Sequence, residues 1–143
     1  MSFDLQIQNN DLVLKNGDFK TVSGTNKLSQ DVLKMCLTTA GSNPFNPWYG
    51  SFISRTIIGN PNDTPILVQI SKSQLYTSLE NLKKLQDLQI KSFQRVSSDE
   101  LIAAISNIAI VRDQSDQRIF NVYISILTKG NNQLSTGFNV NSM

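Results

Sequence analysis

The chain has 143 residues, a formal net charge of +2, no histidine and a single cysteine, Cys36. Hydrophobic residues make up 39% and charged residues 17%, both low for a globular protein, and amide and hydroxyl side chains fill the difference. These values exclude histidine-based catalysis, most zinc and iron sites and an intrachain disulfide. The scattered basic residues do not favour nucleic-acid binding.

The length predicts a single domain over residues 1–143, with Cys36 as a core residue. The first residues, Met1 to Asp4, lack the basic start and the apolar run of a signal peptide. No apolar stretch approaches the roughly 20 residues that cross a bilayer. We therefore expect synthesis and folding in a reducing cytoplasm, with no membrane partner.

Residues 1–22 predict a small β-meander. Apolar and polar side chains alternate along residues 3–8, and two further short strands follow at 11–15 and 18–22. Asn9-Asn10 and Asn16-Gly17 separate the strands, and Asn-Gly is among the strongest short hairpin signals.

Residues 23–96 form the predicted helical part. Its first helix opens at Ser23-Gly24-Thr25, runs to about Thr39 and closes at Gly41, which suits a left-handed cap. Apolar side chains recur along it at helical spacing, which gives one buried face. These residues are Leu28, Val32 and Cys36, with Leu33 and Leu37 beside them.

Residues 41–50 predict an ordered aromatic loop. Its prolines oppose regular structure, whereas its aromatic side chains favour burial. We expect the loop to pack on the core or on a partner, and its candidate partner-binding residues are Pro44, Phe45, Pro47, Trp48 and Tyr49.

A short helix over residues 51–58 and a break at 59–62 precede a long helix over residues 65–93. Asp63 or Thr64 is its expected cap, and the segment either continues as one helix or bends near residues 71–73 into two. The apolar positions of this helix are Ile66, Ile70, Leu75, Leu79, Leu82, Leu85, Ile90 and Phe93.

Residues 97–143 predict a C-terminal three-stranded antiparallel meander. Ser97 or Ser98 caps a short helical turn. Three strands follow, at residues 104–113, 118–128 and 134–140. The apolar face of this sheet needs a cover, which the long helix can supply. The chain is therefore α+β, with an N-terminal meander, helices including one long helix, and a C-terminal meander.

Catalysis without histidine would need paired carboxylates, as in glycoside hydrolysis. Glu80 lies in mid-helix, where an exposed side chain is expected, and Glu100 belongs to a helical first turn. No phosphate-binding loop is present, and the residues from Asp113 to Asp116 indicate a hairpin turn better than a calcium loop. We expect no enzymatic activity, no cofactor and no metal.

Two segments carry a family resemblance. NGDFKTVSGTNKLSQDVLK occupies residues 16–34, and LTTAGSNPFNPWYG occupies residues 37–50. They resemble phage baseplate wedge proteins related to the small lysozyme-like wedge subunit of T-even phages. The order of the later elements is also similar, so the resemblance spans nearly the whole chain.

The resemblance implies a structural wedge subunit of a contractile tail baseplate, present in multiple copies around the tail axis. It implies a virion protein made in the cytoplasm of the bacterial host, with the tail sheath protein, other wedge proteins and the tail tube as partners. Family members accept a strand from the first sheath ring, and type VI secretion relatives share this role. β-augmentation of this kind fits the meander of residues 118–140, and either of its two edges could accept the strand. The last strand is one of these edges. Its implied contact residues are Leu134, Thr136, Phe138 and Val140.

One motif departs from the family pattern. Many members carry Glu-Pro-Arg after the long helix, where this chain has Phe93-Gln-Arg-Val96. Arg95 corresponds to the arginine and is a further candidate contact residue, whereas the glutamate and the proline are missing. Two alternatives to a structural subunit stay open: a tail-associated peptidoglycan hydrolase that uses paired carboxylates, and a chaperone or adaptor that binds tail proteins transiently.

Overall fold

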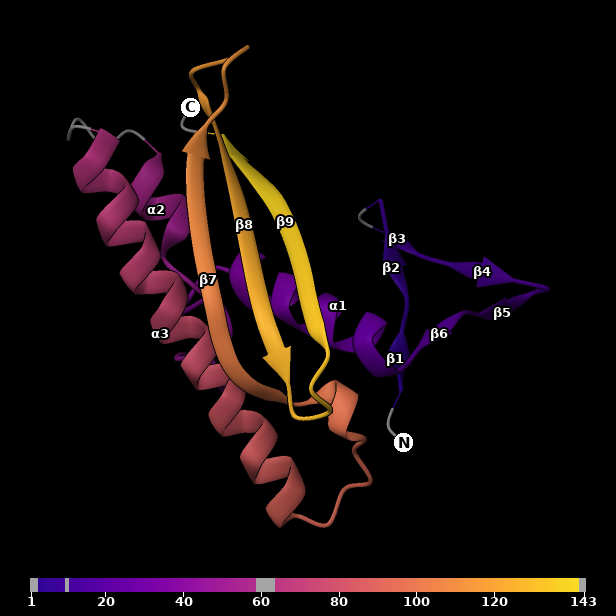
Figure 1. Ribbon diagram of the computed structural model, residues 1–143. Helices are drawn as coiled ribbons and strands as arrows, with labels where there is room; N and C mark the ends of the chain where they lie inside the picture. The colour runs from indigo at the N-terminus through magenta and orange to yellow at the C-terminus, as the bar shows by residue number, and fades with distance from the viewer. Residues whose placement is uncertain (1–2, 10, 59–63, 142–143) are drawn as a thin grey trace.

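The computed structural model describes residues 3–9, 11–58 and 64–141. A three-stranded sheet carries helices on one face, and an N-terminal β-arm extends from the side of this body (Figure 1). The predicted α+β class is therefore confirmed. The expected turn residue Asn10, the break at 59–62 and the possible cap Asp63 lie outside the described residues.

The C-terminal sheet consists of β7 (Ile102–Arg112), β8 (Ile119–Thr128) and β9 (Gln133–Asn141), in that spatial order and antiparallel. Strand alternation turns one side chain of every two toward the helices. β7 starts two residues earlier than the predicted residue 104, because Ile102 already pairs with Thr128. The buried residues on β8 are Phe120, Val122, Ile124, Ile126 and Thr128.

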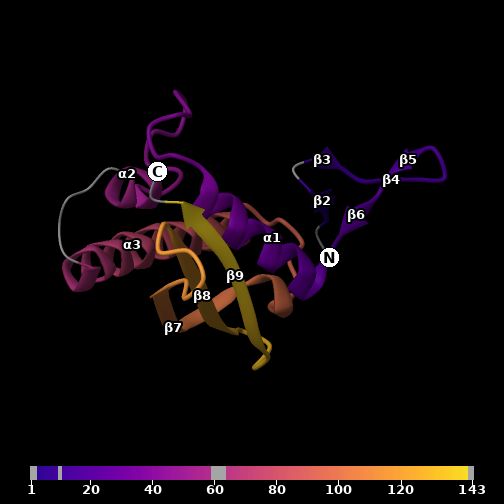
Figure 2. The same ribbon diagram turned by 90° about the horizontal axis from the view of Figure 1, so that it is seen from above.

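The helices α1 (Gly24–Leu37), α2 (Ile53–Ile57) and α3 (Thr64–Lys91) complete the body. Figure 2 shows α1 and α3 on the same side of the sheet, where α3 packs on β7 and α1 on β9. α3 is one uninterrupted helix of 28 residues, which decides between the two alternatives for this segment. The helical core residues are Leu28, Val32, Met35, Cys36, Ile53, Ile57, Leu67, Leu75, Leu79 and Leu82.

Several apolar positions of the helices lie outside this core. Ile66, Ile70 and Ile90 are exposed, because a straight α3 turns only one stripe toward the sheet. Phe93 follows the end of the helix, has a φ of 60° and is 94% exposed. In α1, Met35 is buried and Leu37 is exposed, although the sequence pattern had placed Leu37 beside the apolar face.

The N-terminal arm is built from three two-stranded antiparallel ladders. These ladders pair β1 (Asp4–Leu5) with β6 (Thr21–Val22), β2 (Ile7–Gln8) with β3 (Asp11–Leu12), and β4 (Leu14–Lys15) with β5 (Asp18–Phe19).

A ring of backbone hydrogen bonds joins the three ladders of the arm. Gln6 donates its N–H to the Lys20 carbonyl at 2.8 Å, Lys20 donates to Val13 at 2.8 Å, and Val13 donates back to Gln6 at 3.1 Å. Each expected strand is thus divided at its centre, and the meander becomes a three-way junction. Such short ladders are not stable alone, so the arm depends on its contacts with α1.

Gln30 and Lys34 of α1 supply those contacts. The Gln30 Oε1 accepts the N–H of Ile7 at 2.9 Å, and its Nε2 donates to the Leu5 carbonyl at 2.8 Å. Lys34 forms an ion pair with Asp4. One face of α1 therefore fixes where the arm leaves the body.

Glu100 connects the helices to the start of the sheet. It ends the 3₁₀ turn η1 (Ser98–Glu100), and its buried carboxylate accepts the N–H groups of Gly24 and Ser97, each at 3.2 Å. Its carbonyl accepts from the buried Gln86 side chain of α3 at 3.0 Å, and Gln86 accepts the Ile102 N–H at 2.9 Å. This network holds the beginnings of α1 and β7 against α3.

Replacing Glu100 with alanine should lower the free energy of unfolding by about 3 kcal/mol, because backbone N–H groups lose a buried acceptor. Glu100→Gln should cost less, since the amide retains an acceptor oxygen. Urea denaturation measures both, with Glu80→Gln as the matched control at a partly exposed glutamate. A Glu100→Ala variant as stable as the parent protein would contradict the importance of this network.

Candidate functional site

The two edges of the C-terminal sheet differ in regularity. The pairing of β7 with β8 shifts register between Ile102 and Ala104 and again between Ile105 and Asn107. β9 pairs with β8 without a shift, and no strand within the described residues pairs with its other side. Bulges protect an edge against strand addition, whereas a straight edge leaves a continuous row of backbone groups. β9 is therefore the edge better suited to accept a strand.

The hairpin before β9 fixes which backbone groups point outward. Thr128 donates its backbone N–H to the Asn132 carbonyl at 2.9 Å, so this pair is of the hydrogen-bonded type. Hydrogen-bonded and non-bonded pairs alternate along an antiparallel ladder. Counting along the register, Ser135, Gly137 and Asn139 occupy non-bonded pairs with β8. Their N–H and C=O groups therefore point away from the sheet.

The last-strand residues named from the sequence lie between those outward groups. Val140 is buried, Leu134 and Phe138 pack against the core, and Thr136 accepts a hydrogen bond from Ser29 of α1 at 3.3 Å. Their backbone groups belong to the ladder with β8. These four residues therefore hold β9 against the core and β8. Sequence reasoning missed that the residues between them, Ser135, Gly137 and Asn139, carry the outward backbone groups. Strand alternation together with the hairpin length could have shown which residues of β9 point their backbone groups outward.

Gly137 leaves room for the Tyr123 ring on the outer face of the sheet at this edge. Gly137 lies opposite Tyr123, and a Cβ at this glycine would stand 3.2 Å from the tyrosine ring and 3.0 Å from the Val122 carbonyl oxygen. The exposed Tyr123 ring therefore lies close to the outer face of the glycine, whose backbone stays exposed at the edge. A larger residue at Gly137 would displace that ring.

The aromatic loop is ordered by its own hydrogen bonds. Asn43 accepts the Phe45 N–H at 3.0 Å, and Gly41 donates to the Pro47 carbonyl at 3.0 Å. Phe45 is nevertheless 90% exposed, which contradicts anchoring of its ring on the body of the protein. The expected contact with a neighbouring protein stays a prediction for Phe45.

The other loop residues divide between the surface and the core. Tyr49 is the aromatic residue that packs against the core, and Trp48 is 43% exposed. Pro44 and Pro47 are both exposed. The loop is thus fastened at its C-terminal end and leaves its tip free.

Arg95 lies apart from the loop. It is exposed in the connection that follows α3, whereas α2, which follows the loop, packs beside the earlier part of that helix (Figure 1). The structure therefore distributes the sequence-predicted contact residues over three surfaces: the loop, the end of α3 and the β9 edge.

The only two glutamates of the chain do not form an open pair of carboxylates. Glu80 is partly exposed on α3, whereas Glu100 is buried and bound by backbone N–H groups. A glycosidase needs both carboxyl groups to reach one substrate. These two side chains do not meet that requirement.

Two aspartates do face one hollow, between the arm and α1. Asp4 and Asp31 line it together with Lys27 and Lys34, and Lys27 pairs with Asp31 at 2.8 Å. Burial opposes ionisation of Asp4, but the Lys34 ammonium and the Leu5 N–H outweigh it and hold the pKa of Asp4 below its usual value. Burial likewise opposes the charge on Lys34, yet Asp4 and Asp31 raise the pKa of this lysine. A general acid needs a raised carboxyl pKa, so this cluster is an ion-pair network that fastens the arm.

Cys36 lies in the core, as the sequence pattern predicts. Burial raises the pKa of its thiol to about 12, so the reactive thiolate is scarce at neutral pH. The described part of the chain contains no cluster of three or more potential metal ligands. In the same residues, no helix has the length and apolar character needed for a membrane span.

Comparisons with known proteins bear on the fold. No family model matches the chain, and no curated protein matches it. A solved structure of a Geobacter sulfurreducens protein, described by the words "tail lysozyme", superposes with a TM-score of 0.56 at 10% sequence identity. The match covers 93% of this chain and 97% of that protein. The two proteins share a fold.

The shared fold includes nearly all of both chains, so the arm, helices and sheet together correspond to one known architecture. At this identity the likeness reports the fold alone. The N-terminal β-region, the long helix and the C-terminal sheet inferred from the sequence agree with it.

The loss in free energy of unfolding on truncating each aromatic residue of the loop should increase with the burial of its ring. Tyr49→Ala should lower the free energy of unfolding by about 2 kcal/mol and Trp48→Ala by about 1 kcal/mol, because less of the indole is removed from water. Phe45→Ala should leave it unchanged and serves as the control. Chemical denaturation of the three variants checks this order, and a Phe45→Ala loss as large as that of Tyr49→Ala would contradict the exposed position of Phe45.

Proposed function

We propose that the chain is a structural subunit of the baseplate wedge of a contractile phage tail, where it anchors the sheath and initiates its assembly. The observation that carries the proposal is the straight, unpaired β9 edge, with outward backbone groups at Ser135, Gly137 and Asn139. The family resemblance of residues 16–50 and the fold shared with a protein described as a tail component support it.

Strand addition suits the side chains that surround this edge. The outer face of the sheet presents Asn121, Ser125, Ser135 and Asn139, with Tyr123 and Val111 as its large exposed apolar residues. A face of this kind offers no broad hydrophobic patch. Main-chain hydrogen bonds do not depend on side-chain chemistry, and they give affinity in β-augmentation.

The number of copies compensates for the modest strength of one edge. A hydrogen bond contributes about 1 kcal/mol net, so one added strand binds weakly after its ordering cost. Several subunits around the tail axis would present several edges to one sheath ring. Simultaneous binding then raises the overall affinity without any new contact.

Other surfaces fit contacts with neighbouring wedge proteins and the tail tube. The ordered aromatic loop presents the exposed Phe45, and Arg95 adds an exposed cation after α3. The arm exposes further apolar side chains, which would be shielded from water in an assembly. These side chains are Phe3, Leu5, Ile7, Leu12, Leu14 and Phe19.

A tail-associated peptidoglycan hydrolase is the second candidate function, since the protein that shares the fold is described by the word lysozyme. The buried Glu100 has both carboxylate oxygens bound by backbone N–H groups, so it does not face a substrate. The pKa of Asp4 is lowered, whereas a general acid needs a raised one. A transient chaperone or adaptor is distinguished by its absence from mature particles, which protein analysis of purified tails detects.

Proline substitutions at neighbouring positions of β9 test the proposed function. Ser135→Pro and Asn139→Pro remove outward N–H donors and should leave the ladder with β8 intact, so the protein should fold and sheath initiation should fail. Thr136→Pro removes a ladder donor and should destabilise the protein itself. Sheathed tails are counted by electron microscopy, and melting temperatures are measured in parallel.

The matched controls are Ser135→Ala and Asn139→Ala, which retain the backbone N–H and should assemble normally. Full sheath assembly on folded Ser135→Pro and Asn139→Pro variants would contradict initiation at β9.

The hydrolase alternative is tested on purified cell walls. We expect no release of soluble peptidoglycan fragments under conditions in which a known muralytic enzyme releases them. Cleavage that disappears in Glu80→Gln or Glu100→Gln would establish the enzyme and overturn the structural assignment.

A further inference from the structure

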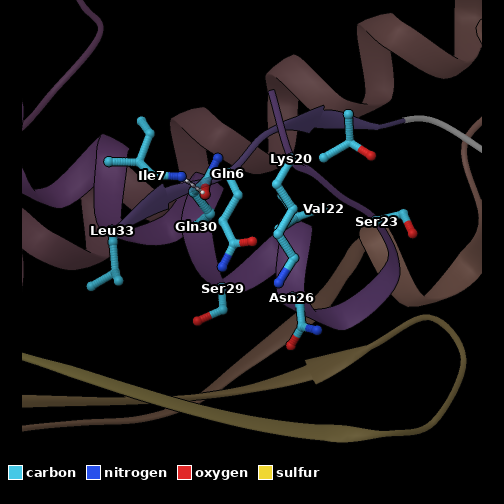
Figure 3. Close-up of a pocket in the computed structure, with 10 residues that line it drawn as sticks. Gln6, Ile7, Lys20, Val22, Ser23, Asn26, Ser29, Gln30 and Leu33 are labelled. Atoms are coloured by element: carbon cyan, nitrogen blue, oxygen red, sulfur yellow. Dashed lines mark hydrogen bonds between the residues drawn. The ribbon is translucent and has the colours of Figure 1, made fainter. Parts of the chain in front are cut away.

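Two hollows open along α1, the helix that packs on β9. The first, of about 500 Å³, lies near the start of α1 and is lined by residues of the arm and the helix. Figure 3 shows Asn26 and Ser29 pointing from α1 toward the C-terminal strands, while the arm lies on the other side of the helix. A second hollow of about 330 Å³ lies at the far end of β9, where Leu37 and Ile58 meet residues 139–141.

One stripe of α1 connects the two hollows. Leu28 and Val32 face the core, Ser29 contacts Thr136 of β9, and Gln30 binds the arm. Successive residues of a helix turn by about 100°, so residues 33 and 37 follow Ser29 along the helix at four-residue steps. The stripe Ser29, Leu33 and Leu37 therefore lies between the side of α1 that contacts β9 and the side that holds the arm.

The apolar part of this stripe lacks cover in the free protein. Leu37 is 57% exposed, and Leu33 is partly exposed and lines the larger hollow. A strand added to β9 would lie about 4.8 Å beyond it, above this stripe. The added strand would thus cover side chains that the three-stranded sheet leaves in water.

The spacing of the stripe matches the repeat of a β-strand. Four helical residues rise about 6 Å, and two strand residues rise about 6.8 Å. Side chains that alternate along an added strand would therefore stand in turn over Ser29, Leu33 and Leu37. The existing contacts agree with this course, because Ser29 meets Thr136 near the start of β9 and Leu37 shares a hollow with Val140 near its end.

We propose that the strand accepted at β9 is amphipathic and that α1 reads its inward face. A small or polar side chain stands over Ser29, and apolar side chains two and four positions away, toward the end of β9, stand over Leu33 and Leu37. This inference rests on the proposed function, since it specifies the partner segment of the same edge. It makes the α1 stripe a specificity determinant and β9 the source of backbone hydrogen bonds.

The test measures binding of the purified sheath protein of the same tail to variants of this chain. The double variant Leu33→Ser and Leu37→Ser should fold and bind the sheath protein about tenfold more weakly, because the apolar contact with the inserted strand is lost. Leu88→Ser is the matched control: Leu88 is 56% exposed, close to the 57% of Leu37, but it lies on α3. This control should bind normally.

The outcomes separate this inference from the proposed function. Binding lost in Ser135→Pro but unchanged in the double leucine variant would overturn the reading by α1 and leave strand addition at β9 standing. No binding of the unaltered protein to the sheath would overturn the proposed function itself. An equal loss in Leu88→Ser would show a non-specific apolar contact and would also overturn the role of the α1 stripe.

Discussion

The buried side chain of Glu100 joins elements that lie far apart in the sequence. Its carboxylate receives the N–H of Gly24, 76 residues earlier, and its carbonyl receives the Gln86 amide, which also binds the first residue of β7. An anion at a helix N-terminus stabilises the exposed N–H groups and the helix dipole. The start of α1 and the start of the sheet are therefore fixed at one point. The course of α1 against β9 depends on this junction.

The two edges of the C-terminal sheet differ. Register shifts interrupt β7, whereas β9 stays straight and keeps alternate backbone groups unpaired. Natural sheets usually blunt such edges, and in the proposed function a sheath strand covers this one. Gln30 and Lys34 of α1 hold the arm. The same helix therefore contacts both the arm and β9.

Much of this fold could be predicted from periodicity. The alternation in residues 118–128 gave a strand with Phe120 and Ile126 inward, and both are buried. Glu100 could be placed in a helical first turn, but its bond to Gly24 is a long-range contact that no local pattern reveals. For the same reason the arm was expected as a meander, since the backbone ring at Gln6 closes only in three dimensions. The site was found only in part, because which residues of β9 point their backbone outward depends on the hairpin register.

Residue-resolved amide hydrogen exchange of the protein, alone and mixed with the sheath protein proposed as its partner, tests strand addition at β9 most directly. In the free protein the N–H groups of Ser135, Gly137 and Asn139 should exchange rapidly, while those of Thr136 and Phe138, bonded to β8, should be protected. Binding of the sheath should slow exchange at the first three positions by at least about tenfold. Unchanged exchange at Ser135, Gly137 and Asn139 in the sheath-bound protein would contradict strand addition at this edge.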